Sequence, residues 1–139
     1  MPFQHRSLAL LSALAFALPI TVAPQVWARS AGTERTLKAV DTDNDGSVDL
    51  NEAKAAAEAT FGRLEKNKDG TVDTKELQGR VSRKDLKAAD SDNDGTLDKN
   101  EYLALVEQRF KAADPDGDGK LDAKELKTPA GKSLLQLLK

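Results

Sequence analysis

Residues 90–101 decide the fold, and they read Asp-Ser-Asp-Asn-Asp-Gly-Thr-Leu-Asp-Lys-Asn-Glu. Acidic side chains fill positions 1, 3, 5, 9 and 12 of this stretch, and glycine fills position 6. An EF-hand loop has this pattern, because it surrounds one cation with oxygens from positions 1, 3, 5, 7, 9 and 12. The glycine permits the left-handed turn that brings both halves of the loop around the ion. The stretch is therefore predicted to bind a cation.

The pattern occurs four times, with first residues separated by 24, 25 and 24 positions. We number the windows loop 1 (41–52), loop 2 (65–76), loop 3 (90–101) and loop 4 (114–125). A single match could be an acidic turn with no ion. Four matches in register, each with glycine at position 6 and glutamate at position 12, indicate a repeated metal-binding unit.

Each loop supplies six predicted ligand positions, with position 7 acting through its backbone carbonyl and position 12 through a bidentate glutamate. In loop 1 they are Asp41, Asp43, Asp45, Ser47, Asp49 and Glu52, and in loop 2 they are Glu65, Asn67, Asp69, Thr71, Asp73 and Glu76. In loop 3 they are Asp90, Asp92, Asp94, Thr96, Asp98 and Glu101, and in loop 4 they are Asp114, Asp116, Asp118, Lys120, Asp122 and Glu125.

Loop 2 differs from the other three loops, which carry five carboxylates each. It has the longer Glu65 at position 1 and the neutral Asn67 at position 3, and Lys66 and Lys68 lie between its ligands. Because the two lysines repel a cation, loop 2 is predicted to be the weakest site.

Composition limits the other chemistries. The chain has no cysteine, and its single histidine is His5. Zinc, copper, haem and iron–sulfur sites are therefore not expected, and neither is an enzyme with a catalytic triad. Nineteen of the 23 acidic residues fall in the four loops, where they repel one another unless cations are present. No basic block is long enough to indicate nucleic-acid binding.

The N-terminus has the features of a secretory signal peptide. Arg6 gives a positive start, an apolar run follows from Leu8 to Leu18, and a small-residue cleavage site ends at Ala28. The run is too short to span a bilayer, although an uncleaved anchor is the alternative. We predict a removed signal peptide (1–28), a flexible N-terminus (29–36) and a four-EF-hand domain (37–139) of a periplasmic protein without a membrane partner after cleavage.

Only 12 or 13 residues separate consecutive loops, so one helix must lead out of one loop and into the next. Apolar positions at helical spacing predict a helix after loop 1 and another after loop 3. Their stripes are Leu50, Ala53, Ala57, Phe61 and Leu64, and Tyr102, Leu105, Val106, Arg109, Phe110 and Ala113. Position 8 is predicted to join paired loops through a short strand contact and an apolar plug, formed by Val48, Val72, Leu97 and Leu121.

The segment after loop 2 is interrupted at Gly79, and Ser82 is predicted to begin a new helix with Asp85 as its capping-box partner. Thr128 and Pro129 are predicted to begin an apolar tail helix that completes the core rather than binding a partner. A simple antiparallel bundle would place loops 1 and 3 at one end and loops 2 and 4 at the other. The break at Gly79 leaves this pairing open.

The predicted core is thin, with Phe61, Tyr102 and Phe110 as the aromatic residues after residue 37. Because no disulfide can strengthen so small a domain, bound metal is the expected substitute. We expect a loose metal-free state that compacts into a small helical bundle on loading. Near-native helicity in strong chelator would contradict this expectation.

From about Leu37 onward the chain resembles the lanmodulin family, periplasmic lanthanide-binding proteins of methylotrophic bacteria. The resemblance rests on the close loop spacing, on aspartate at position 9 of every loop, and on three segments. These are Leu77-Gln-Gly-Arg-Val-Ser82, Asp94-Gly-Thr-Leu-Asp-Lys-Asn-Glu-Tyr102 and Thr128-Pro-Ala-Gly131.

This resemblance implies an all-α fold, a compact three-helix bundle with four EF-hand loops at its periphery and short inter-loop helices. It implies lanthanide(III) binding in preference to calcium, with a folding response. It also implies a role beside lanthanide uptake machinery and lanthanide-dependent methanol dehydrogenase, and it leaves a monomer and a metal-dependent dimer both open. One departure is that proline, typical of position 2 in the family, occurs only at Pro115, which predicts weaker selectivity.

Two other functions are compatible with the loops. A periplasmic calcium buffer or sensor is the main alternative, although a sensor usually exposes a Met-rich groove and Met1 is the single methionine. A dockerin-type structural module also uses repeats of about this length, but it carries two rather than four. Five carboxylates around one ion favour a trivalent cation, because Coulomb attraction scales with the product of the charges.

Overall fold

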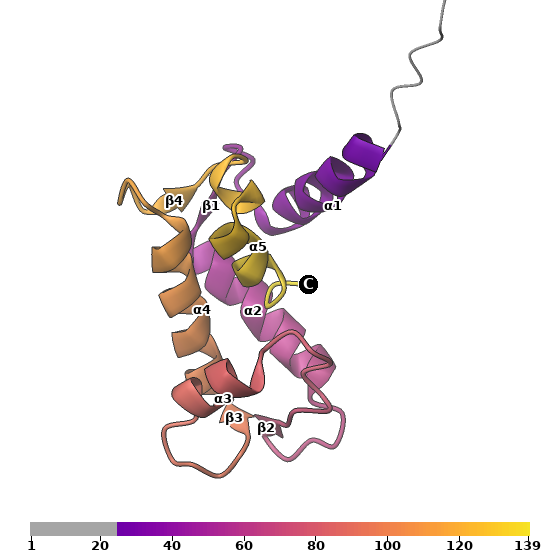
Figure 1. Ribbon diagram of the computed structural model, residues 1–139, viewed down its shortest axis with the longest axis vertical. Coiled ribbons are helices and arrows are strands. Elements are labelled where there is room, and N and C mark those ends of the chain that lie inside the picture. The colour runs from indigo at the N-terminus through magenta and orange to yellow at the C-terminus, as the bar shows by residue number, and fades with distance from the viewer. Residues whose placement is uncertain (1–24) are drawn as a thin grey trace, which may run out of the picture.

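The computed structural model describes residues 25–139, with side chains from residue 32 onward (Figure 1). Its helices are α1 (Gln25–Val40), α2 (Leu50–Leu64), α3 (Arg83–Ala89), α4 (Lys99–Ala113) and α5 (Pro129–Leu135), with a 3-10 turn η1 (Glu125–Lys127). Its strands are β1 (Val48–Asp49), β2 (Thr71–Val72), β3 (Leu97–Asp98) and β4 (Lys120–Leu121). The prediction that the fold is helical is confirmed for the described residues.

The long helices α2 and α4 begin inside the predicted metal loops. Asp49 and Asp98 are their N-caps, and each accepts a 2.8 Å hydrogen bond from the amide of the glutamate three residues later. Glu52 and Glu101 accept hydrogen bonds from the N-cap amides in return, at 3.1 and 3.0 Å. This reciprocal capping box satisfies amides that an α-helix leaves free at its start. Positions 9 and 12 of loops 1 and 3 therefore also start a helix.

The structure pairs loop 1 with loop 4 and loop 2 with loop 3, which answers the question that the break at Gly79 left open and differs from the pairing in a simple antiparallel bundle. Strand β1 pairs antiparallel with β4, and β2 pairs antiparallel with β3. The reason lies in the lengths of the connecting helices. Each 15-residue helix, α2 and α4, carries the chain from one end of the molecule to the other, whereas the interrupted segment 77–89 returns it to the same end (Figure 1).

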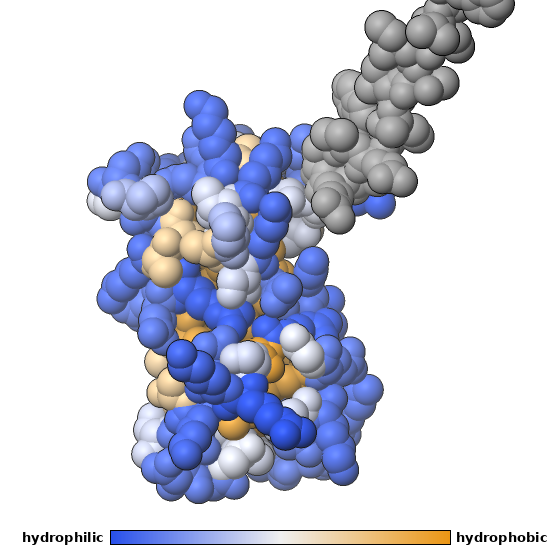
Figure 2. Space-filling view, in the orientation of Figure 1, coloured by the Kyte–Doolittle hydropathy of each residue, from blue (hydrophilic) through white to orange (hydrophobic). Residues whose placement is uncertain are grey.

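The core lies between the two loop pairs, where α4 packs against both α2 and α5. The rings of Phe61 and Tyr102 meet edge to face with their centroids 5.6 Å apart. Both ends of the molecule are hydrophilic, and hydrophobic side chains show between them (Figure 2). The predicted plug and tail are confirmed, because the following side chains are all buried: Val48, Val72, Leu97, Leu121, Leu134, Leu135, Leu137 and Leu138.

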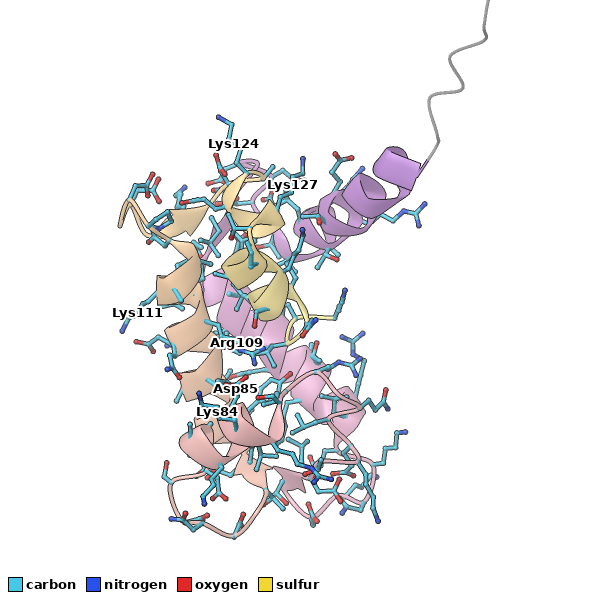
Figure 3. All side chains as sticks on the ribbon, in the orientation of Figure 1. Lys84, Asp85, Arg109, Lys111, Lys124 and Lys127 are labelled. Atoms are coloured by element: carbon cyan, nitrogen blue, oxygen red, sulfur yellow. The ribbon has the colours of Figure 1, made fainter. Side chains whose placement is uncertain are left out.

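Asp85 does not complete the predicted capping box of α3. Ser82 is the N-cap, as predicted, and accepts a 3.1 Å hydrogen bond from the Asp85 amide. The Asp85 carboxylate instead pairs with Arg109 of α4, at 3.2 Å (Figure 3). Arg109, largely buried, also donates to the carbonyl of Ser133 at 2.8 Å. The charged member of the predicted apolar stripe therefore ties α3 and the tail to α4.

Helix α1 begins upstream of the predicted domain and includes residues 29–36, which we expected to form a flexible N-terminus. Thr33 and Val40 are buried and Leu37 packs partly against the core, so one face of this helix has a partner. The predicted signal peptide lies mostly outside the described residues. None of the helices in residues 25–139 is long and apolar enough to cross a membrane.

The buried phenol of Tyr102 gives a test of this core. Its hydroxyl donates to the carbonyl of Leu137 at 2.8 Å, and burial raises its pKa to about 12. An unfolded tyrosine titrates near pH 10, so the neutral phenol stabilises the fold fully below pH 10. That stabilisation is lost as the pH rises toward 12.

Because Tyr102 is the single tyrosine, phenolate absorbance reports on it directly. We expect a midpoint near pH 12 in the folded protein and near pH 10 in denaturant. A midpoint near 10 in protein whose helicity is intact would contradict this packing. The stability of the variant Tyr102→Phe should not fall between pH 10 and pH 12 through this ionisation, because phenylalanine has no hydroxyl group to lose a proton.

Candidate metal centre

Three loops each gather three carboxylates. Within each group, oxygens from every member lie within 4.8 Å of one another. The groups are Asp41, Asp43 and Asp45 in loop 1, Asp90, Asp92 and Asp94 in loop 3, and Asp114, Asp116 and Asp118 in loop 4. Carboxylates at this spacing repel one another, and a cation that prefers oxygen removes the repulsion. The donor set therefore fits a hard cation.

Backbone amides hold the first aspartate of loops 1 and 3 in place. Asp41 accepts from the amides of Asp45 and Gly46 at 3.2 and 3.0 Å, and Asp90 accepts from the equivalent amides of loop 3 at 3.2 and 2.9 Å. Gly46 donates one of these hydrogen bonds and has a φ of 87°, a left-handed conformation that glycine adopts readily. Both aspartates are buried, so these hydrogen bonds fix the start of each loop.

Position 4 is a feature that the sequence analysis missed. Asn44, Asn93 and Gly117 occupy it in loops 1, 3 and 4, and all have positive φ values, of 59°, 60° and 71°. Asparagine and glycine tolerate this left-handed conformation better than other residues do. Loop 2 has Lys68 there, with a φ of 59°, which adds backbone strain to its weaker ligand set. An asparagine or glycine two residues before the loop glycine was the available signal.

The glutamates at position 12 are held over the start of their own loops. The position 2 amides of Thr42, Lys66 and Ser91 donate to Glu52, Glu76 and Glu101 at 2.6, 3.0 and 2.6 Å. Loop 4 has Pro115 at this position, and proline has no amide hydrogen. In loops 1, 2 and 3 the predicted bidentate ligand is thus already positioned at the start of the loop.

The aspartates at position 9 accept hydrogen bonds from the position 12 amides, including Asp73 and Asp122, at 2.7 and 2.8 Å, in loops 2 and 4. These aspartates were predicted as metal ligands. The structure adds a local capping role, for which the Asp-x-x-Glu spacing was the signal. At position 7, the hydroxyls of Ser47 and Thr96 donate to the position 5 aspartates at 2.6 Å each.

The charges within a loop affect one another. The pKa of Asp43 is raised, even though its strongest influence, a hydrogen bond from the Asp45 amide, lowers it. Desolvation and the negative charges of Asp45 and Glu52 outweigh that hydrogen bond. Asp92 of loop 3 shows the same balance. These carboxylates hold protons more tightly than an isolated aspartate, as expected for a crowded anionic site.

Loop 2 does not gather three carboxylates, because Asn67 occupies position 3. The Asn67 amide group donates to Asp69 at 2.7 Å, and Glu65 accepts from the Gly70 amide at 2.7 Å. The loop backbone therefore follows the same course with less negative charge at its centre. Its rank as the weakest site stays a prediction.

Comparison with known proteins supports the assignment of these loops as EF-hand loops. An EF-hand family model matches residues 34–54, 84–106 and 105–128, which contain loops 1, 3 and 4. Lanmodulin of Methylorubrum extorquens is 52% identical over 85 residues, which are 61% of this chain and 59% of lanmodulin. The chain thus spans about three fifths of the relative's length. The resemblance predicted from the sequence is confirmed.

Proposed function

Because the chain is an EF-hand relative of lanmodulin, we propose that it binds lanthanide(III) ions selectively through its EF-hand loops. The observation that carries the proposal is the convergence of three aspartates in each of loops 1, 3 and 4. With the aspartate at position 9 and the glutamate at position 12, each of these loops offers one ion five carboxylates. We propose the ligand positions given above for all four loops as the binding residues, with calcium as the weaker alternative ligand.

The preference for a trivalent ion follows from charge. Lanthanide ions have one more charge than calcium and a similar demand for oxygen ligands. Since each carboxylate attracts an ion in proportion to the ion's charge, a loop with five carboxylates favours the trivalent ion. The raised pKa values of Asp43 and Asp92 support the proposal, because they reflect the repulsion that such an ion would relieve.

We propose that loading also drives folding. The long helices α2 and α4 begin inside loops 1 and 3, where loop positions 9 and 12 form their capping boxes, so ordering these loops also orders the helix starts. Binding free energy then becomes folding free energy. In this proposal α2, α4 and α5 form the predicted three-helix core. The setting is the periplasm, beside lanthanide uptake machinery or a lanthanide-dependent methanol dehydrogenase.

The test is a far-UV circular dichroism titration of residues 29–139 with chelator-buffered lanthanum(III) and, separately, calcium(II). We expect helicity to rise at lanthanum concentrations orders of magnitude below the calcium concentrations that have the same effect. Amide resonances of Gly46, Gly70, Gly95 and Gly119 report the four loops one by one, and we expect Gly70 to respond last. Similar concentrations for both cations would show instead a calcium-binding EF-hand protein.

The calcium alternative has one specific observation in its favour. Position 2 holds Thr42, Lys66 and Ser91 in loops 1 to 3, where the family typically has proline. The amides of these residues bind the position 12 glutamates, as described above. A chain that differs from the family at this position in three loops can also differ in selectivity, and the paired titrations decide between the two ions.

A further inference from the structure

Lys120 places a positive charge on the neighbouring loop. It is residue 7 of loop 4, and it lies in β4 directly opposite Asp49 of β1. From there its ammonium group forms an ion pair with Asp45, the position 5 aspartate of loop 1. The residue at the equivalent place in the other pair is Thr71, opposite Asp98. Loop 1 therefore has a lysine on a predicted ligand, and loop 3 has a neutral hydroxyl side chain in the corresponding position.

The electrostatic effect of this ion pair extends beyond one carboxylate. Within it, the Lys120 ammonium group donates a hydrogen bond to the Asp45 carboxylate. Asp43 and Asp49 also attract the ammonium group. About half of the Lys120 side chain is exposed, so it is free to move away when an ion arrives. Its charge nevertheless remains at the junction of the two loops, because β4 is anchored by the buried Leu121.

We propose that Lys120 determines the selectivity of loop 1, an inference that rests on the proposed function of the loops. An ion that enters loop 1 must displace the ammonium group from Asp45 and is then repelled by it. This repulsion is proportional to the charge of the ion, so Lys120 weakens the binding of a trivalent ion more than the binding of a divalent one. Loop 3 discriminates between the two ions more strongly than loop 1 for the same reason.

The variant Lys120→Met tests this role, since methionine keeps an unbranched side chain without the charge. Lanthanum(III) and calcium(II) are titrated separately, and the amides of Gly46 and Gly95 report loops 1 and 3. We expect the affinity of loop 1 to rise about tenfold for lanthanum and about fivefold for calcium, following the ratio of the ionic charges. Loop 3 should keep its affinity for both ions.

Lys127→Met is the matched control, because Lys127 is exposed and lies near the same end of the molecule but outside the loop (Figure 3). Lys120→Arg keeps the charge and should bind like the unmodified protein. Equal gains for the two ions, or an equal gain in Lys127→Met, would overturn the proposal. If the unmodified loop 1 showed no preference for lanthanum, the proposed function would fail, whereas the gain in calcium affinity would still decide the role of Lys120.

Discussion

Glu101→Gln is expected to lower the affinity of loop 3 for lanthanum(III) by on the order of a hundredfold or more. The substitution removes one negative charge and the bidentate carboxylate from the proposed site. Changes to residues that only support a metal ligand already cost about 10–100-fold in affinity, so loss of a ligand should cost at least as much. The Gly95 amide measures this effect, because it lies within loop 3.

Glutamine is the informative replacement at this position. One side-chain oxygen of Glu101 accepts from the Asp98 amide in the capping box of α4, and a glutamine oxygen can accept the same hydrogen bond. The Ser91 amide, which donates to the other oxygen of Glu101, loses its acceptor in the variant. Because the capping hydrogen bond is kept, the start of the helix should survive, and the metal-free variant should have the same helicity as the metal-free unmodified protein. A metal-free variant with less helicity than the metal-free unmodified protein would show instead that the residue acts mainly as a helix cap.

Glu107→Gln provides the matched control for charge. Glu107 lies on the same helix and outside the loops, where it pairs with Lys54 and Lys111 at 2.9 and 2.8 Å. Such pairs at the surface contribute about 0–1 kcal/mol, so the affinity of loop 3 should hardly change in this variant. If both variants lost affinity equally, total charge rather than coordination by Glu101 would explain the loss.

The features that the sequence predicted correctly depend on neighbours within a few residues. The position 8 plug and the starts of α3 and α5 at Ser82 and Thr128 follow from local spacing and capping chemistry. The clustering of aspartates within a loop also follows from local spacing, because loop positions 1, 3 and 5 lie on one short turn. Short stretches of sequence with fixed chemistry, in the loops and at the helix starts, are enough to determine these structures.

The pairing of the loops could not be predicted in this way. It depends on how segment 77–89 turns back after loop 2, and that turn uses positive φ angles at Gln78 and Gly79, of 50° and 79°. Arg109 then holds α3 against α4 through Asp85, which is 24 residues away in sequence. A glutamine in the left-handed region gives no sequence signal, and a long-range ion pair gives none either.

The contact between Lys120 and Asp45 could not be predicted from the sequence for the same reason. The two residues are 75 positions apart, and they meet because β1 pairs with β4. As residue 7 of loop 4, Lys120 was predicted to bind the ion only through its backbone carbonyl. Once the pairing of the loops is known, the side chain acquires a second role that the repeat alone does not contain.

Gly131→Ala is expected to destabilise the protein by about 3 kcal/mol, near the upper end for overpacked sites. A methyl group on Gly131 would lie 2.2 Å from the carbonyl oxygen of Glu125 and 2.5 Å from the Cα of Leu126. Both atoms belong to the backbone, and Leu126 is fully buried, so no flexible side chain can move aside. The junction between η1 and α5 must shift as a unit. Urea denaturation of the metal-loaded protein measures this loss in the free energy of unfolding.

Because Glu125 closes loop 4, the same shift should weaken ion binding there and leave loop 3 unaffected, as the Gly119 and Gly95 amides would show.

Gly62→Ala is the matched control, since Gly62 lies exposed within α2 and an added methyl group would contact nothing within 4 Å. There alanine should stabilise the helix by about 0.5–1 kcal/mol. The same substitution is thus predicted to lower the stability of the protein at Gly131 and to raise it at Gly62. A neutral or stabilising Gly131→Ala would mean that α5 does not approach loop 4 so closely, and the link between the tail helix and the metal site would be lost.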